Sequence, residues 1–322
     1  MDWSKLRRDK VKARKPSGVY ADLEELIRIQ FKARDFSFLP TQPVSSVLSG
    51  RFASRLRGRG LNFEELRQYR PGDDVRTIDW KVTARTRKPH VRVFTEEKDR
   101  AVLLVVDQRI NMFFGTRNRM KSVTAAELAA LAAWRAKDVG DRVGGVVFND
   151  SEMIDHAPKG NQPAVMSILG SLIRMNHLLQ ADQGPSSSPD MLNKALVKAG
   201  QLAPHDALVI IVSDFDGINE ETERQVSKLA GHNDVLAVLV HDPIRMSPPT
   251  MPLSVSNGAL QIDLNFNDRT IREKVLNDYK SEEETIRHFL RKLKTPLLTI
   301  SNEGDVVGQI RKLLGVPGRD AR

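Results

Sequence analysis

The stretch Ala101-Val102-Leu103-Leu104-Val105-Val106-Asp107 indicates the fold of this chain. Its apolar residues do not alternate with polar ones, a pattern typical of a strand that is buried on both faces in a parallel sheet. Similar apolar runs recur at 142–148, 207–212 and 235–240. The segments between them have helical periodicity, at 124–138, 163–175, 191–202 and 220–230. We therefore predict an α/β fold, with a doubly wound, mostly parallel sheet and helices on both of its faces.

The remaining segments flank this alternation. Towards the carboxyl end we expect a hairpin near 259–264, a long charged helix at 270–294, a strand at 297–300 and a last helix before Gly315. Upstream we expect an amphipathic helix at 20–34, with Leu23, Leu26, Ile27 and Phe31 on its apolar side, and then short strands and turns. The predicted organisation is a basic tail at 1–18, a helix and basic β-rich extension at 19–97, the α/β domain at 98–316 and a short tail at 317–322.

Composition narrows the class of protein. Of the 322 residues, 40% are hydrophobic, which is enough to bury a core, and none is cysteine. The lack of cysteine excludes disulfides, thiolate zinc sites, iron–sulfur clusters and a cysteine nucleophile. The apolar runs are far shorter than the roughly 18 residues of a membrane-spanning helix. The basic amino terminus leads into no apolar segment of a secretory signal, so we expect a cytoplasmic protein, with recruitment to the inner face of the membrane left open.

The net charge of +9 is concentrated at one end of the chain. Residues 1–100 contain 24 Lys and Arg against 14 Asp and Glu, whereas the rest of the chain contains 26 against 27. Such asymmetry indicates a two-part protein, or a basic segment that meets an acidic protein, a nucleic acid or a membrane surface.

Two apolar runs end in acid, at Asp107 and at Ser213-Asp214. Ligands of open parallel sheets bind outside the carboxyl ends of the strands. If these two strands are neighbours, as in the usual doubly wound order, Asp107 and Asp214 lie within reach of one ion. Carboxylate and amide oxygens are the ligands that Mg²⁺ prefers.

The upstream segment carries a specific resemblance. It contains Ser49-Gly50, Arg57-Gly58-Arg59-Gly60, the run from Phe63 to Trp80, and Ala84-Arg85, followed by the strand that ends in Asp107. This series resembles the bacterial family catalogued as domain of unknown function 58, over roughly residues 45–310. The resemblance implies a non-catalytic protein with a von Willebrand factor A-like fold. It also implies a MoxR-type AAA+ ATPase as partner, in the assembly or maturation of other proteins, with a client protein or other von Willebrand A proteins as further partners.

The resemblance also implies a metal-ion-dependent adhesion site, of the pattern Asp-x-Ser-x-Ser. The family aspartate falls on Asp107, but the two serines fall on Arg109 and Asn111, and Ser188 and Asp190 are the nearest substitutes for a threonine ligand. The expected ligands of a Mg²⁺ ion are thus Asp107, Asn111, Ser188, Asp190 and Asp214. Arg109 would have to point away, because its charge about 4 Å from a divalent ion costs on the order of 8 kcal/mol at an effective dielectric near 20. The alternative is a degenerate site in which Asp107 pairs with Arg109.

The basic segment has two interpretations. In the first, Arg51, Arg55, Arg57 and Arg59 meet an acidic partner, together with Arg109 and Asp216 at the sheet edge. In the second, the arginines among 67–85 are neutralised by nearby acids in a compact hairpin, which Trp80 anchors to the sheet. Both leave catalysis to the partner.

Two other functions remain open. Gly115–Ser122 nearly matches a phosphate-binding P-loop, which would make the chain a nucleotide hydrolase, but Met120 stands where the motif requires glycine. Lys121-Ser122 is better interpreted as the start of a helix. Non-specific nucleic-acid binding through Lys5–Lys15 and Arg51–Arg59 is the other alternative, although the basic third has no recognisable nucleic-acid-binding motif.

Overall fold

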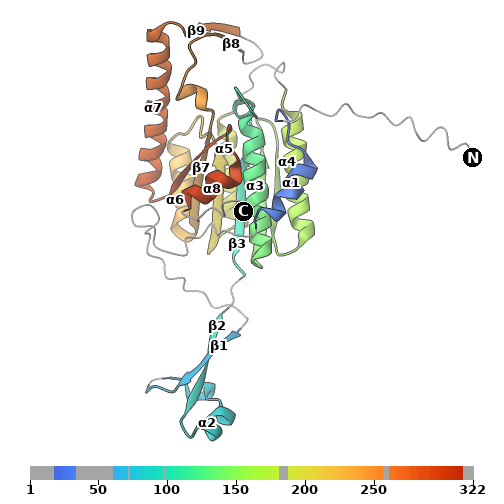
Figure 1. The fold of residues 1–322 in the computed structure, drawn as a ribbon, viewed down its shortest axis with the longest axis vertical. Coiled ribbons are helices and arrows are strands. Elements are labelled where there is room, and N and C mark those ends of the chain that lie inside the picture. The colour runs from blue at the N-terminus through green and yellow to red at the C-terminus, as the bar shows by residue number, and fades with distance from the viewer. Residues whose placement is uncertain are drawn as a thin grey trace, which may run out of the picture. The chain divides into compact units, whose positions relative to one another are not determined.

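The computed structural model describes residues 18–33, 61–71, 73–96, 99–180, 188–256 and 261–314. The chain forms two compact units, of which the smaller is Phe52–Arg100 and the larger comprises Met1–Arg51 and Ala101–Arg322 (Figure 1). In the described part of the chain, no helix has both the length and the apolar character needed to span a membrane.

The larger unit contains a six-stranded sheet with the order β10-β7-β6-β3-β4-β5. Its strands are β3 (Ala101–Asp107), β4 (Arg142–Phe148), β5 (Met153–Lys159), β6 (Ala207–Ser213), β7 (Asp234–His241) and β10 (Leu297–Ser301). All neighbours are parallel except β4 and β5. The predicted doubly wound α/β fold is therefore confirmed. The prediction missed β5, an edge strand whose side chains are mostly accessible and which contains Pro158.

Helices cover both faces of the sheet, as predicted. They are α3 (Lys121–Asp138), α4 (Gln162–Leu178), α5 (Asp190–Leu202), α6 (Glu220–His232), α7 (Arg269–Lys292) and α8 (Val306–Leu313). On β3, Leu104 and Val106 belong to the core with α3, α4 and α8, whereas Leu103 and Val105 belong to the core with α5, α6 and α7. A strand with a continuous apolar run serves both cores because its successive side chains point to opposite faces.

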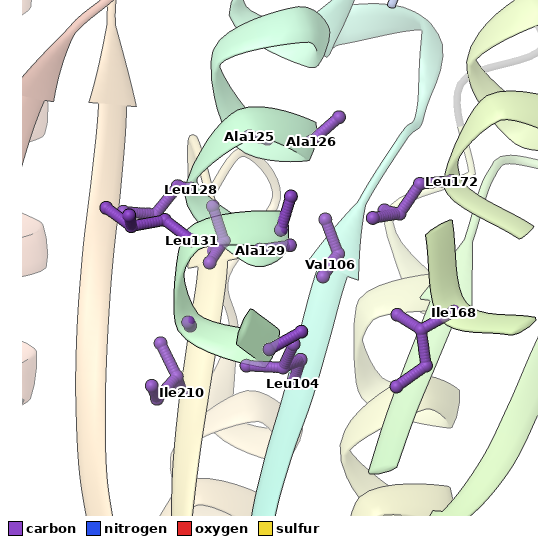
Figure 2. Close-up of a cluster of buried hydrophobic side chains, with 14 of the residues drawn as sticks. Leu104, Val106, Ala125, Ala126, Leu128, Ala129, Leu131, Ile168, Leu172 and Ile210 are labelled. Carbon is purple, nitrogen blue, oxygen red and sulfur yellow. The ribbon is translucent and has the colours of Figure 1, made fainter. Parts of the chain in front are cut away.

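Small side chains on α3 bring this helix close to the sheet. Figure 2 shows Leu104 and Val106 beside Ala125, Ala126 and Ala129 of α3, all of them buried. The start of α3 at Lys121 confirms that Lys121-Ser122 opens a helix. Near the other end of α3, buried Trp134 donates from Nε1 to the carbonyl oxygen of Leu26, at 3.0 Å.

The helix expected at 20–34 is shorter and packs on the larger unit. It comprises α1 (Leu23–Arg28), capped by Asp22, and the 3₁₀ turn η2 (Ile29–Phe31). Leu26 is buried, but Phe31 is 66% exposed, so the predicted apolar side is only partly covered. The helix belongs with the larger unit and not with the basic extension, because Leu26 lies in the core that contains α3 and α4.

The smaller unit is built on an antiparallel hairpin of β1 (Leu61–Gln68) and β2 (His90–Glu96). Between the strands lie the 3₁₀ turn η4 (Val75–Thr77) and the helix α2 (Trp80–Thr86), which is capped by buried Asp79. Trp80 is 70% exposed, so the interpretation of Trp80 as an anchor to the sheet is wrong. Trp80 is the first residue of α2, and most of its surface is open to solvent.

The remaining elements lie mostly beyond the carboxyl ends of the strands. They are η5 (Ile110–Met112), η6 (Pro243–Arg245), and the hairpin of β8 (Pro252–Ser256) and β9 (Gln261–Asn265). The hairpin confirms the one expected near 259–264, with its first strand further upstream.

Candidate functional site

Acidic side chains stand at or just after the carboxyl ends of four sheet strands. Asp107 ends β3, Asp150 follows β4, Asp214 follows β6 and Asp242 follows β7. β3 and β6 are parallel neighbours, with Val106 opposite Val212, so the expectation that Asp107 and Asp214 lie at one edge is confirmed. This edge is where open parallel sheets bind ligands, and it is the candidate functional site.

Asp107 and Arg109 form a buried ion pair at this edge. Arg109 donates from Nε to both carboxylate oxygens of Asp107, at 3.1 Å each, and from Nη2 to Oδ2 at 2.7 Å. Its backbone N–H also donates to Oδ1, at 2.9 Å. The side chain of Arg109 is 1% exposed and that of Asp107 is 0% exposed. Because both charges are removed from water, each depends on the other for its stabilisation.

Asp214 binds two cations of the chain itself. Lys121 donates from Nζ to Oδ2 of Asp214 at 2.7 Å, and Nη2 of Arg109 lies 3.8 Å from Oδ1. Burial alone would raise the pKa of Asp214, but Lys121 and Arg109 outweigh burial and hold this pKa below its usual value. Burial also opposes the charge on Arg109, but Asp107 and Asp214 outweigh it and raise the pKa of Arg109. We call Asp107, Arg109, Lys121 and Asp214 the edge cluster; its formal charges balance.

The loop after β6 completes the edge cluster and is strained. Ser213 donates from Oγ to Oδ2 of Asp107 at 2.6 Å, and its Oγ accepts from the backbone N–H of Phe215 at 2.9 Å. Phe215 is buried and has a φ of 58°, in the left-handed region that bulky residues rarely adopt. Such residues cost about 1–3 kcal/mol each and cluster at functional sites. The strain supports assignment of this edge as the site.

Asn111 and Asp216 form the accessible rim of the site. The amide of Asn111 donates to the carboxylate of Asp216, which is exposed. Ser188 and Asp190 flank Pro189, and a Cβ placed on Gly217 would lie 2.6 Å from Cβ of Pro189, so this segment packs against the loop after β6. Ser188 donates its backbone N–H to Asp150 at 2.8 Å, and Asp190 is exposed at the start of α5.

The edge cluster does not fit a divalent cation. Arg109 was expected to point away from such an ion, but its guanidinium lies on the carboxylate of Asp107. The carboxylate of Asp214 is bound by an ammonium and faces the same guanidinium. An added divalent ion would meet two fixed positive charges, at the cost estimated above. The geometry is that of the alternative interpretation, in which Asp107 pairs with Arg109.

Several residues expected at a partner surface are placed differently. Arg109 was expected to contact a partner directly, but it is buried and its charge is bound within the edge cluster. Arg51, Arg55, Arg57 and Arg59 lie outside the described residues. Lys121, the lysine of the P-loop-like stretch, donates to Asp214 and begins its helix after Met120, an arrangement that lends no support to phosphate binding.

Sequence reasoning missed the role of Asp242. Asp242 is buried and accepts four hydrogen bonds, from the backbone N–H and Oγ1 of Thr116, the backbone N–H of Ile244 and Nδ2 of Asn302. It therefore joins the loops that follow β3, β7 and β10. The signal for it was an acid one residue beyond the apolar run 235–240, similar to the acid that directly ends the run at Asp107.

The contribution of Asp242 to the stability of the fold depends on pH. Burial would raise the pKa of Asp242, but hydrogen bonds from Thr116 and Asn302 outweigh it and hold this pKa below the ordinary value. Because the folded pKa lies below the unfolded one, the stabilisation is present above about pH 4 and is lost as the pH falls through the folded pKa. We expect Asp242→Asn to lower the free energy of unfolding by about 1.5–3 kcal/mol at neutral pH.

Urea unfolding between about pH 2 and pH 7 measures this effect. The difference between wild type and Asp242→Asn should shrink towards the acid end of the range. Asp206→Asn is a suitable control, because the Asp206 side chain is partly exposed and pairs with its neighbour His205. A difference that stays constant across the pH range would contradict the role assigned to Asp242.

The chain matches one family model, several uncharacterized relatives and a solved structure. The family model described as "Protein of unknown function DUF58" matches residues 65–285. Uncharacterized proteins of Mycobacterium bovis and Mycobacterium tuberculosis are each 26% identical over 309 residues, which cover 95% of this chain and 95% of each relative. A solved structure of an uncharacterized membrane spanning protein from Vibrio fischeri is 15% identical, and the match covers 68% of this chain and 98% of that chain with a TM-score of 0.22.

Proposed function

We propose that this chain, which belongs to the DUF58 family of proteins of unknown function, acts as a non-catalytic adaptor. In this proposal it docks onto a MoxR-type AAA+ ATPase and works with it in the assembly or maturation of other proteins. The doubly wound sheet, with acids at its carboxyl edge, supports a von Willebrand A-like domain as the scaffold. Catalysis then belongs to the ATPase.

An exposed aromatic and cationic surface on the smaller unit carries this proposal. Trp80 is 70% exposed and Val75 is 59% exposed. Exposed basic side chains lie in the same segment, at Arg76, Lys81, Arg85, Arg87 and Lys88. We call Val75, Arg76, Trp80, Lys81 and Arg85 the Trp80 surface. Tryptophan and arginine are enriched at protein interfaces and among the few residues that dominate the binding energy.

The carboxylates of this segment accept hydrogen bonds from groups within the smaller unit. Asp73 accepts two hydrogen bonds from Arg67, at 2.8 Å each, and one from the backbone N–H of Arg70. Asp74 and Asp79 accept backbone N–H groups at the starts of η4 and α2. The acids thus maintain the local fold while the basic side chains face solvent. A partner with an acidic surface and an apolar pocket for Trp80 is complementary to this arrangement.

Binding of the purified ATPase from the same organism tests the proposal. We expect Trp80→Ala to weaken the affinity by about tenfold or more, as for an interface hot spot, and Lys81→Glu to weaken it through charge repulsion. Arg174→Glu is the matched charge control, because Arg174 is exposed on α4 of the larger unit and its side chain pairs with Glu152 of the same unit. Calorimetry with the full chain measures the dissociation constants.

The outcomes separate the adaptor from its alternative. Equal affinity for wild type, Trp80→Ala and Lys81→Glu would overturn the assignment of this surface, and no binding of the ATPase would overturn the adaptor function. An aromatic side chain among cations is also typical of single-stranded nucleic-acid binding. Titration with a single-stranded oligonucleotide at two salt concentrations tests that alternative, which predicts strongly salt-dependent binding that Trp80→Ala weakens.

A further inference from the structure

The edge cluster already contains positive charges, which a metal site would obtain from a bound ion. Its two carboxylates come from neighbouring parallel strands and carry two formal negative charges. Its guanidinium and its ammonium are bound to those same carboxylates, at 2.7 Å for the closest contact of each. The cations are therefore an integral part of the site and are supplied by the chain.

The position of Arg109 is the important feature. It contacts both oxygens of Asp107 and approaches Asp214, so it bridges the acids at the ends of β3 and β6. A second hydrogen bond from its Nη2, at 3.2 Å, reaches the carbonyl oxygen of Asp216 at the rim. A divalent ion held by Asp107 and Asp214 would perform the same task, linking two strand ends and the loop after β6 through their oxygens.

We propose that Arg109, assisted by Lys121, permanently takes the place of a divalent cation at this edge, so that the site is organised without metal. An arginine stays charged across the working pH range, and a guanidinium does not dissociate from the chain as a bound ion does. The proposal goes beyond the proposed function, because it concerns the sheet edge of the larger unit and not the Trp80 surface of the smaller one. It is tested on the isolated full chain, so its failure is distinct from a failure to bind the ATPase.

Removing the guanidinium should open the place for an ion. Arg109→Ser leaves a hydroxyl two residues after Asp107 and keeps Asn111 and Asp214 as oxygen donors. Binding of Mn²⁺, as a probe for Mg²⁺, is measured by the loss of free-ion electron paramagnetic resonance signal. We expect no saturable binding by wild type and saturable binding of one ion per chain by Arg109→Ser. The double variant Arg109→Ser/Asp107→Ala should lose the ion again.

Arg174→Ser is the matched control, because it removes the same charge from an exposed position on α4. It should behave as wild type, which shows that gained binding is not a result of the lower net charge. Saturable binding by wild type that disappears in Asp107→Ala would overturn the proposal. If neither wild type nor a folded Arg109→Ser bound Mn²⁺, the proposal would be overturned as well. The guanidinium would then not occupy a position that an ion can take.

Loss of the buried ion pair can prevent Arg109→Ser from folding, and a refolding measurement covers that case. Wild type should refold from urea equally well with Mg²⁺ and with chelator. Arg109→Ser should refold better with Mg²⁺, because the ion would neutralise Asp107 and Asp214. Equal failure of Arg109→Ser with and without Mg²⁺ would contradict the proposal, because an ion could not then substitute for the guanidinium.

Discussion

Replacement of Arg109 with alanine should lower the free energy of unfolding by about 3–5 kcal/mol. The substitution leaves Asp107 buried and without its guanidinium partner, while Asp214 keeps Lys121 as its cationic partner. An uncompensated buried carboxylate either remains charged at a high desolvation cost or takes up a proton, and both destabilise the fold. Urea unfolding at neutral pH, followed by circular dichroism, measures the loss.

Two further variants distinguish the loss of the buried ion pair from the loss of an arginine elsewhere. Arg174→Ala removes an arginine from an exposed ion pair with Glu152, so it should cost no more than about 1 kcal/mol. Asp107→Ala/Arg109→Ala removes both charges, and its cost should be smaller than the sum of the two single substitutions by about 0.5–3 kcal/mol. If Arg109→Ala cost as little as Arg174→Ala, the buried pair could not be the organising contact of the edge.

The second large effect is expected at Trp134. Trp134→Ala should lower the free energy of unfolding by about 3–5 kcal/mol, because it removes a large side chain that is 3% exposed and leaves a cavity. It also removes the hydrogen bond from Nε1 to the carbonyl oxygen of Leu26, which links α3 to α1. We therefore expect α1 to loosen before the sheet unfolds.

Limited proteolysis and urea unfolding together test both parts of this prediction. Trp134→Phe keeps most of the bulk but lacks the N–H donor, so it should cost less than the alanine substitution and still speed cleavage near α1. Leu131→Ala is a second control, since Leu131 is buried on the same helix but forms no hydrogen bond to α1 in the structure. Cleavage near α1 that is equally fast in Leu131→Ala would show that Trp134 has no special role in holding α1.

The sequence predicted the main sheet correctly because burial on both faces leaves a local signature. The apolar runs at β3, β4, β6 and β7 are continuous, and the helices between them have their own periodicity. An acid directly after an apolar run then identified Asp107 and Asp214 as edge residues. The edge strand β5 escaped prediction because its side chains are not continuously buried and Pro158 interrupts its pattern.

Periodicity along the chain could thus establish the fold class and place Asp107 and Asp214 at strand ends, whereas the adjacency of their strands was assumed from the usual doubly wound order. It could not establish the direction of the Arg109 side chain, the partner of Lys121 or the exposure of Trp80. Ser213 reaches Asp107 across 106 residues of sequence, and Lys121 reaches Asp214 across 93. Pairings of this kind depend on distances between strand ends that exist only after the sheet has formed. Tertiary structure alone decided that Asp107 and Asp214 are neutralised by cations of the same chain.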